Sequence, residues 1–259
     1  METQTGAQLT RSEAVYLEKR GHLAELILNR PAVLNAENWQ MAEAFHAVLD
    51  ELEKAKEIRA VVVTGAGRSF SSGVDLRALA AGELGIAWFR SFDEAMRRLE
   101  QLHALTVAKM RGYAIGGGLQ IALACDLRVA APDTKVGLPA VMEALIPGMG
   151  TYRLPRFIGL GRARRLVLTG ELIAAEEALR IGLLDWVVPE EKLDETTERV
   201  IADVLKGSQT AQAFSKKLVT GAFESDYETA FAKYLDYQEQ SLQSSDHEHA
   251  MADYRNRKK

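Results

Sequence analysis

The chain has 259 residues, of which 47% are apolar, and a formal net charge of −4. This length supports one globular domain with a sizeable core plus an appendage rather than two full domains. The acidic balance argues against nucleic acid as the main partner, because phosphate binding leaves a basic surface. A single cysteine, Cys125, excludes an internal disulfide, and we expect a buried structural thiol. The polar start and the lack of an apolar run of about eighteen residues predict neither export nor a membrane span, so we expect a cytoplasmic protein.

The first elements are predicted to be a hairpin, a helix and a buried strand. Residues 15–28 read as two strands joined by a short turn, and Pro31 then bars a helix from the loop that follows. Between residues 36 and 56 the apolar side chains recur at helical spacing, which predicts an amphipathic helix lying on a core. Residues 59–65, RAVVVTG, predict the next strand.

The alternation of strands and helices then repeats. A loop rich in glycine and serine over residues 65–73 precedes helical sequence at 75–102, a strand at 106–114, a helix after three glycines and a strand at 126–131. Strands that alternate with helices predict a layered α/β fold with crossover connections.

The last third of the chain is predicted to be mostly helical. Helical periodicity covers residues 162–169 and 175–181, one short strand is expected at 184–188, and helices continue to the end. We therefore divide the chain into a core of residues 1–190 and a helical region of residues 191–259. A helical region of this length is expected to pack on the core or on a neighbouring subunit.

Two junctions between a loop and a helix are candidates for a site. Residues 69–76, SFSSGVDL, and residues 113–120, YAIGGGLQ, both place small residues directly before a helix. The first turn of a helix has unpaired N–H groups and a partial positive charge, and glycine lets a ligand approach the backbone. If the two junctions face each other, the N–H groups of Val74 and Gly117 can point at one carbonyl oxygen, which is the layout of an oxyanion hole.

Other kinds of site fit these residues less well. The stretch TGAGRSF lacks the third glycine and the later acidic residue of a dinucleotide site. Ser71 and Ser72 are outside the G-x-S-x-G frame of a serine hydrolase, and the five histidines lack the spacing and partners of a metal site. The glycines at 116–118 can also serve only to let a helix pack tightly on a strand, and this structural interpretation stays open.

Several motifs resemble the enoyl-CoA hydratase/isomerase (crotonase) superfamily. They follow one another along nearly the whole chain and include LNRPAVLNA, VVVTGAGRSFSSGVDL, MRGYAIGGGLQIALACDLRVAA, VGLPAVMEALIPGMGTYRLPRFIG and TGELIAAEEALRIGLLDWVV. The resemblance implies a crotonase-like spiral of repeated ββα units and a helical C-terminal region that mediates trimers, often paired into hexamers. It also implies a coenzyme A thioester as substrate, no separate cofactor or metal, and an enolate held by the N–H groups of Val74 and Gly117.

The resemblance further implies which residues lie along the thioester. Arg77 stands where the family often has a lysine near the coenzyme's phosphates. Residues 84–99 correspond to the variable part that lines the acyl pocket, and their aromatic side chains suggest a sizeable apolar acyl group. The residues expected along the substrate are Leu34, Ser72, Asp75, Leu76, Arg77, Trp88, Phe92 and Ala140.

Both glutamates with which hydratases of this family add water are absent. Their positions hold Gln120 and Ala140, and an amide can orient water but cannot carry a proton at neutral pH. Glu143 lies three residues after Ala140, so one helical turn would bring its carboxylate to the space that Ala140 leaves. Burial in the apolar run VMEALI would raise the pKa of Glu143; the alternative is that Glu143 faces solvent or pairs with an arginine such as Arg153.

We therefore expect an acyl-CoA enzyme of the hydratase/isomerase type, a lyase or an isomerase, with Val74, Gly117, Gln120 and Glu143 as the catalytic residues. A double-bond isomerisation with one acid, or a hydration run by Glu143 with Gln120 positioning water, fits these residues best. A malonyl-type acyl-CoA decarboxylase and a catalytically silent acyl-CoA-binding protein are the alternatives. The expected partners are the acyl-CoA substrate and identical subunits in a trimer or hexamer, with neither nucleic acid nor a membrane.

Overall fold

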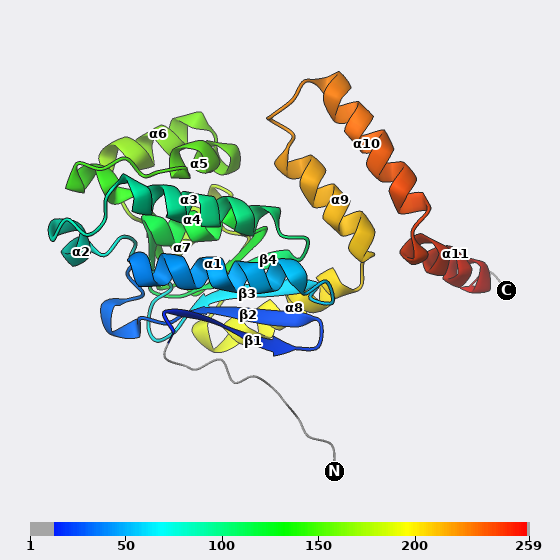
Figure 1. The fold of residues 1–259 in the computed structure, drawn as a ribbon, viewed down its shortest axis with the longest axis horizontal. Coiled ribbons are helices and arrows are strands. Elements are labelled where there is room, and N and C mark those ends of the chain that lie inside the picture. Colours follow the sequence, from blue (N-terminus) through cyan, green and yellow to red (C-terminus); the bar gives the residue numbers. More distant parts are fainter. Residues whose placement is uncertain (1–12, 258–259) are drawn as a thin grey trace, which may run out of the picture.

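The computed structural model describes residues 13–257. Its main layer is a six-stranded sheet in the order β1-β2-β3-β4-β6-β9 (Figure 1). The strands β1 (Val15–Arg20) and β2 (Leu23–Leu28) form the predicted antiparallel hairpin. The others follow in parallel: β3 (Ala60–Gly65), β4 (Leu105–Met110), β6 (Leu127–Ala130) and β9 (Trp186–Val187). A second sheet pairs β5 (Tyr113–Ile115) in parallel with β7 (Lys135–Gly137), which pairs antiparallel with β8 (Ile173–Ala174).

Helices surround both sheets. The helices of the first part are α1 (Trp39–Lys54), α2 (Leu76–Ala80), α3 (Ile86–Gln101), α4 (Gly117–Ala124), α5 (Gly150–Ile158), α6 (Leu160–Thr169) and α7 (Ala175–Arg180). The helices of the second part are α8 (Leu193–Leu205), α9 (Gln209–Thr220), α10 (Tyr227–Leu242) and α11 (Ser245–Arg257). Short 3₁₀ helices are η1 (Pro31–Val33), η2 (Pro139–Glu143) and η3 (Glu190–Lys192).

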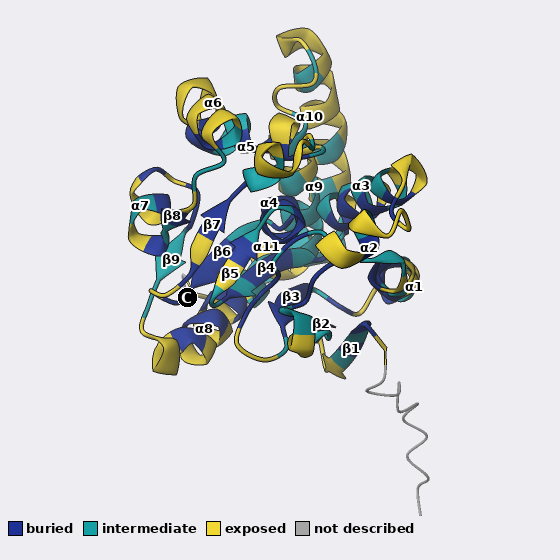
Figure 2. Cartoon of the chain, turned by 90° about the vertical axis from the view of Figure 1, so that its left-hand side faces the viewer, coloured by how far each residue is buried: buried dark blue, intermediate teal, exposed yellow. Residues whose placement is uncertain are grey.

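The strand β3 shows how the core is built on both faces of the main sheet. Every residue of β3 is buried. Val61 and Val63 belong to the larger core, which α1, α3 and α4 complete, whereas Ala60 and Val62 belong to a smaller core completed by α8. A parallel strand that is covered on both faces is apolar throughout, which explains the run AVVVTG. Figure 2 shows the same pattern, with buried residues gathered in the strands and in α4.

The structure differs from the prediction at two long segments. The single helix predicted over residues 75–102 is two helices, α2 and α3, because Gly82 between them has a φ of 74°, which a helix does not accommodate. The strand predicted over residues 106–114 ends at Met110. Gly112, with a φ of 60°, then turns the chain into β5 of the other sheet. The strands β7 and β8 and the helix α5 had no counterpart in the prediction.

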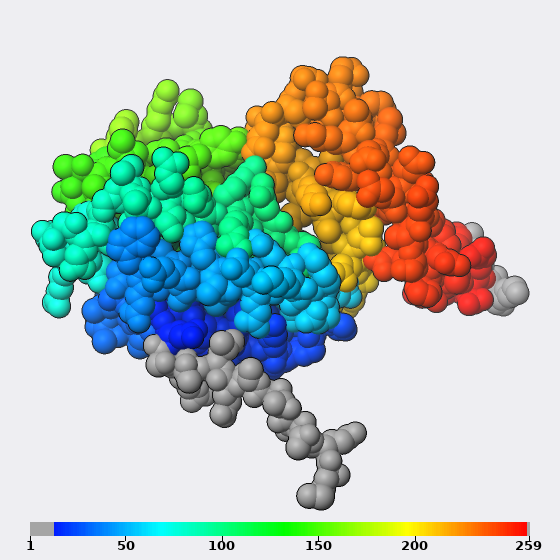
Figure 3. All heavy atoms as spheres, viewed as in Figure 1, coloured from blue at the N-terminus to red at the C-terminus, as the bar shows by residue number. Residues whose placement is uncertain are grey.

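The helical end of the chain has two parts. The helix α8 buries apolar residues such as Leu193 and Val200 against the main sheet. The helices α9, α10 and α11 have no fully buried residue. The helix α9 contacts the core through the Lys216 ammonium, which donates to Asp126 Oδ2 at 2.8 Å, whereas α10 and α11 lie farther out and form one end of the molecule (Figures 1 and 3). The exposed apolar side chains of these three helices include Val219, Tyr227, Leu235 and Leu242, and Phe223 in the turn between α9 and α10 is exposed beside them, a surface typical of protein contacts. A trimer or hexamer stays a prediction, as does a boundary after residue 190.

The remaining expectations concern the thiol, metals and membranes. Cys125 is buried and unpaired, as expected, and burial raises the pKa of its thiol to about 12. Within residues 13–257, no three His, Cys, Asp or Glu side chains are placed to hold a metal ion. In the same part of the chain, no helix has the length and apolar character that crossing a bilayer requires.

Candidate active site

The loop before α1 is fixed by one asparagine. Leu34 and Asn35 both have positive φ angles, 54° and 56°, and this left-handed conformation costs roughly 1–2 kcal/mol for a residue other than glycine. The buried Asn35 amide offsets this cost, because its Nδ2 donates to the carbonyls of Ser69 and Phe70 at 2.8 and 3.0 Å. These bonds hold the loop against the segment that precedes α2.

Glu37 and Val74 form an isolated parallel bridge that orients the first candidate donor. The Glu37 N–H donates to Gly73 O at 2.9 Å, and the Asp75 N–H donates to Glu37 O at 2.8 Å. In a parallel pair these bonds use the two neighbours of the central residue, so the N–H of Val74 itself points away from Glu37. Within residues 13–257 this N–H has no acceptor.

Gly117, the first residue of α4, supplies the second candidate donor. Its N–H also has no acceptor in the described part of the chain. The two junctions are in contact, since a Cβ on Gly73 would lie 3.3 Å from the Gly117 nitrogen. The two unpaired N–H groups therefore border the same space, in the layout that the sequence analysis required; their catalytic role stays a proposal.

Two of the glycines also serve close packing. A Cβ on Gly118 would lie 2.6 Å from Ser71 O, and a Cβ on Gly117 would overlap Glu37 Oε2. These two glycines therefore allow close packing of α4 on Ser71 and Glu37. This packing does not compete with the oxyanion-hole interpretation, because the Cβ direction and the N–H direction of Gly117 are different.

A cavity of about 150 Å³ opens beside the two N–H groups. Its apolar wall includes Trp88 and Phe92 of α3, which are buried and stack with ring centroids 5.3 Å apart. An apolar cavity with a few convergent donors suits a ligand that has an apolar chain and one polar carbonyl. The predicted site residues that line it are Ser72, Val74, Leu76, Trp88, Phe92, Gly117, Gln120, Ala140 and Glu143.

Three predicted site residues lie outside the cavity lining. Leu34 contacts it only through Ser72, whose N–H donates to Leu34 O at 2.9 Å. Asp75 caps α2 and forms an ion pair with Arg30 at 3.1 Å. Partial burial opposes its ionisation, but hydrogen bonds from the α2 backbone and from Arg30 hold the pKa of Asp75 below its usual range. Arg77 is exposed on α2.

Gln120 is buried and has a structural partner. Its Oε1 accepts from the Gly150 N–H at 3.0 Å, so the amide anchors the start of α5. No acceptor is assigned to Gln120 Nε2 within residues 13–257. This leaves the donor side of the amide available to the cavity.

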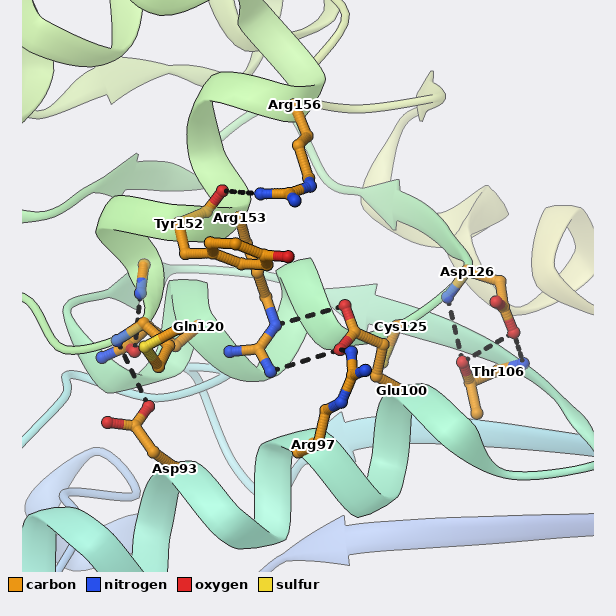
Figure 4. A network of polar contacts seen from close by, with 12 residues as sticks. Asp93, Arg97, Glu100, Thr106, Gln120, Cys125, Asp126, Tyr152, Arg153 and Arg156 are labelled. Carbon is orange, nitrogen blue, oxygen red and sulfur yellow. Dashed lines mark hydrogen bonds and ion pairs between the residues drawn. The ribbon is translucent and has the colours of Figure 1, made fainter. Parts of the chain in front are cut away.

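Glu143 is at the rim of the cavity. It ends η2, and its side chain is exposed, so the burial expected from the apolar run VMEALI is wrong. Pairing with Arg153 is also wrong, because the buried Arg153 pairs with Glu100 at 3.3 Å (Figure 4). Of the alternatives considered, the solvent-facing one describes Glu143.

Asp93 of α3 is a cavity carboxyl that the sequence analysis missed. Its Oδ1 accepts from the Met149 N–H at 3.3 Å. Figure 4 shows it beside Gln120, and both touch Gly148, whose Cβ would lie 2.9 Å from Asp93 Oδ2 and 3.0 Å from Gln120 Oε1. Partial burial raises the pKa of Asp93, although the Met149 hydrogen bond and the charge of Arg153 oppose this. The sequence did contain one signal for Asp93: it follows Phe92 directly, in the segment expected to line the acyl pocket.

Glu37 is the second carboxyl that was missed. It lines the cavity and is fully buried. Its Oε1 lies 2.8 Å from Ser71 Oγ, and its Oε2 has no hydrogen-bond partner in the described part of the chain. Burial raises the pKa of Glu37 to about 8, against the opposing Ser71 hydrogen bond. A perturbed carboxyl in a cavity is typical of functional sites.

The fold and the cavity define an enzyme-like site with two backbone donors, and comparison with known proteins specifies its family. Residues 18–259 match the family model described as enoyl-CoA hydratase/isomerase. The chain is 37% identical over 224 residues to a short-chain-enoyl-CoA hydratase of Clostridium acetobutylicum, covering 84% of this chain and 85% of the relative. It is 34% identical over 232 residues to a crotonyl-CoA hydratase of Syntrophomonas wolfei, and the match covers 85% of this chain and 86% of the relative.

Solved structures of related proteins have the same fold as this chain. An enoyl-CoA hydratase from Bacillus anthracis superposes with a TM-score of 0.90 at 28% identity, over 95% of this chain and 97% of that one. Pseudomonas aeruginosa DspI superposes with a TM-score of 0.89 at 30% identity, over 97% of each chain. The chain thus belongs to the enoyl-CoA hydratase/isomerase family and has the crotonase fold, and with this family it is an enzyme of acyl-CoA thioesters.

Proposed function

We propose that this enzyme binds an enoyl-CoA thioester with the carbonyl oxygen between the N–H groups of Val74 and Gly117, and transfers protons at the enolate that forms. The observation that carries this proposal is the pair of unpaired N–H groups on two touching junctions beside an apolar cavity. Enolate formation concentrates negative charge on that oxygen, and each aligned donor is typically worth about 3–4 kcal/mol.

Two reactions suit this site. In a double-bond isomerisation, a base removes a proton from C2 of a 3-enoyl thioester and the proton returns at C4, so the formula does not change. In a hydration, the oxygen of water bonds to C3, one water proton goes to a base, and a proton is delivered to C2. Isomerisation needs one carboxyl that takes the proton from C2 and returns it at C4, whereas hydration needs either two groups or one carboxyl that takes the water proton and then delivers it to C2.

The cavity offers Glu143 and Asp93 for proton transfer. Glu143 lies on the same 3₁₀ turn as Ala140, at the solvent side of the cavity, and Asp93 lies deeper, beside Gln120. The free Nε2 of Gln120 can hold a water or a thioester oxygen but cannot accept a proton. The names of the relatives favour hydration, with Glu143 as the acid and base and Gln120 positioning the water.

The test is a panel of 2-enoyl-, 3-enoyl-, dienoyl-, malonyl- and 3-hydroxyacyl-CoA thioesters, with products identified by mass spectrometry. We expect turnover of an enoyl thioester that falls about 10²- to 10⁴-fold in Glu143→Gln. Glu43→Gln, an exposed glutamate on α1, is the matched control and should match the unmodified enzyme.

The other outcomes identify the alternatives. An unchanged rate in Glu143→Gln would indicate that Asp93 transfers the proton. The rate of Asp93→Asn then tests this. Release of carbon dioxide from malonyl-CoA shows a decarboxylase, and binding of every thioester without turnover shows a silent acyl-CoA-binding protein.

A further inference from the structure

Ser71 connects Glu37 to the loop that carries the Val74 N–H. The Ser71 hydroxyl oxygen lies 2.8 Å from Glu37 Oε1 and 3.0 Å from Asn35 O, and it accepts from the Gly73 N–H at 3.1 Å. Asn35, Glu37 and Ser71 are all completely buried. Water therefore cannot complete these hydrogen bonds, and the three partners of Ser71 must be satisfied within this group.

Counting hydrogens shows which protonation state fits. A serine hydroxyl has one hydrogen to donate and two lone pairs to accept with. Asn35 O can only accept, and an ionised Glu37 could only accept as well, so one of the two contacts would lack a hydrogen. If Glu37 carries a proton on Oε1, it donates to Ser71, Ser71 donates to Asn35 O, and Gly73 fills the second lone pair. Only the neutral acid satisfies all three contacts.

No neighbouring charge favours the ionised form of Glu37. Arg30 donates to Ala36 O and the Asp75 N–H donates to Glu37 O, and these two charged side chains pair with each other at 3.1 Å. Across the cavity lie Asp93 and Glu143, both acidic. The helix α4, against which Oε2 packs, contains no titratable residue. The surroundings of Glu37 thus either carry no net charge or repel a carboxylate.

We propose that Glu37 is a positioning residue that works as a neutral carboxylic acid, holding the Ser71–Gly73 segment and thereby the Val74 donor in place. The proposal rests on the proposed enolate chemistry. Oε2 of Glu37 occupies the space beside Gly117 that a Cβ would take, so the acid also packs directly against the second donor. Ionisation would leave either Glu37 Oε1 or Asn35 O without the Ser71 hydrogen and would place a negative charge next to the developing enolate, which opposes catalysis through both effects.

The experiment compares the pH profile of thioester turnover in the unmodified enzyme and in Glu37→Gln. A glutamine amide can donate to Ser71 as the neutral acid does, but it cannot ionise. We expect kcat of the unmodified enzyme to fall about tenfold per pH unit above about pH 8, and kcat of Glu37→Gln to stay within about fivefold of the neutral-pH value across the range. Ser71→Ala should lose activity at every pH, because it removes the oxygen that accepts from the Gly73 N–H. The protonation state of residue 37 then makes no difference to that loss. Glu43→Gln should keep the profile of the unmodified enzyme.

A loss of 100-fold or more in folded Glu37→Gln would overturn the proposal, because the carboxyl would then transfer a proton itself. An alkaline fall that persists in this variant would also overturn it. Infrared difference spectra between the unmodified enzyme and Glu37→Gln provide a readout that needs no turnover. They should show the C=O band of a protonated carboxyl at pH 7 that disappears above pH 8. If the band is present but no thioester reacts, the proposed reaction fails while neutral Glu37 stands; if the band is absent at pH 7, neutral Glu37 fails.

Discussion

The neutral state of Glu37 should be visible in the pH dependence of stability. Burial raises the pKa of this carboxyl from 4.5 to about 8 in the folded chain, whereas an unfolded chain exposes it to water. Between these values the folded protein holds a proton that the unfolded chain has lost. The folded state is therefore favoured most at low pH, and this contribution disappears as the pH rises through the folded pKa.

The size of this contribution follows from the pH range between the unfolded and the folded pKa of Glu37. Each pH unit between the unfolded and folded pKa changes the free energy of unfolding by about 1.4 kcal/mol. From pH 5 to pH 8 the unmodified protein should lose about 4 kcal/mol relative to Glu37→Gln, which has no proton to lose at this position. Because all other titrating groups are shared, the difference between the two proteins isolates Glu37.

The assay is urea denaturation of both proteins at pH 5, 6, 7 and 8 and at one protein concentration. The difference in free energy of unfolding, variant minus unmodified protein, should become steadily more positive from pH 5 to pH 8. Glu43→Gln should run parallel to the unmodified protein, because its carboxyl is exposed in both states. Parallel curves for Glu37→Gln and the unmodified protein would refute the neutral buried acid.

Three further predictions concern other parts of the structure. Gly117→Ala should lose about 10²-fold in thioester turnover, because its Cβ would overlap Glu37 Oε2 and displace the donor; turnover within tenfold of normal contradicts this. Arg128→Met should lower the free energy of unfolding by about 1–3 kcal/mol, measured in urea, because the buried guanidinium donates to the carbonyls of Leu183 and Cys125; an unchanged value would contradict this. Cys125, whose thiol pKa burial raises to about 12, should resist iodoacetamide at pH 8 until urea unfolds the chain, and labelling of the folded protein would contradict its burial.

Elements with a strong local pattern were predictable from the sequence. The hairpin β1–β2, the helix α1 and the strand β3 follow from apolar spacing and turn residues, because their own residues decide which face is buried. The segment 75–102 was not predicted correctly. Residues 81–85 separate α2 from α3: Gly82 has a positive φ, and Gly85 is the extended N-cap of α3.

The two junctions were predictable as candidates, whereas the carboxyls of the cavity were not. Each glycine-rich stretch marks its own helix start, but Glu37 and Ser71 are separated by 34 residues and meet only through the folded loop that Asn35 fixes. Asp93 likewise looked like one more charge on a helix with many charges. For Glu143 the apolar neighbours were misleading, since Met142 and Ile146 around it are themselves exposed at 71% and 78%.

Packing and chemistry at Gly117 depend on the same neighbour. The missing Cβ of Gly117 leaves a space inside the protein, and an apolar side chain from residue 37 could fill it without any charge. The chain instead places there an acid whose ionised form would oppose an enolate on the adjacent N–H group. Glu37 is compatible with this position only if it stays neutral. The three hydrogen bonds of Ser71 favour the neutral form, because all three can form only when Glu37 is protonated. Gln120 and Ala140 line the cavity without adding charge, and the acids that line it lie at the rim, beside Gln120, or behind the donor as a neutral group.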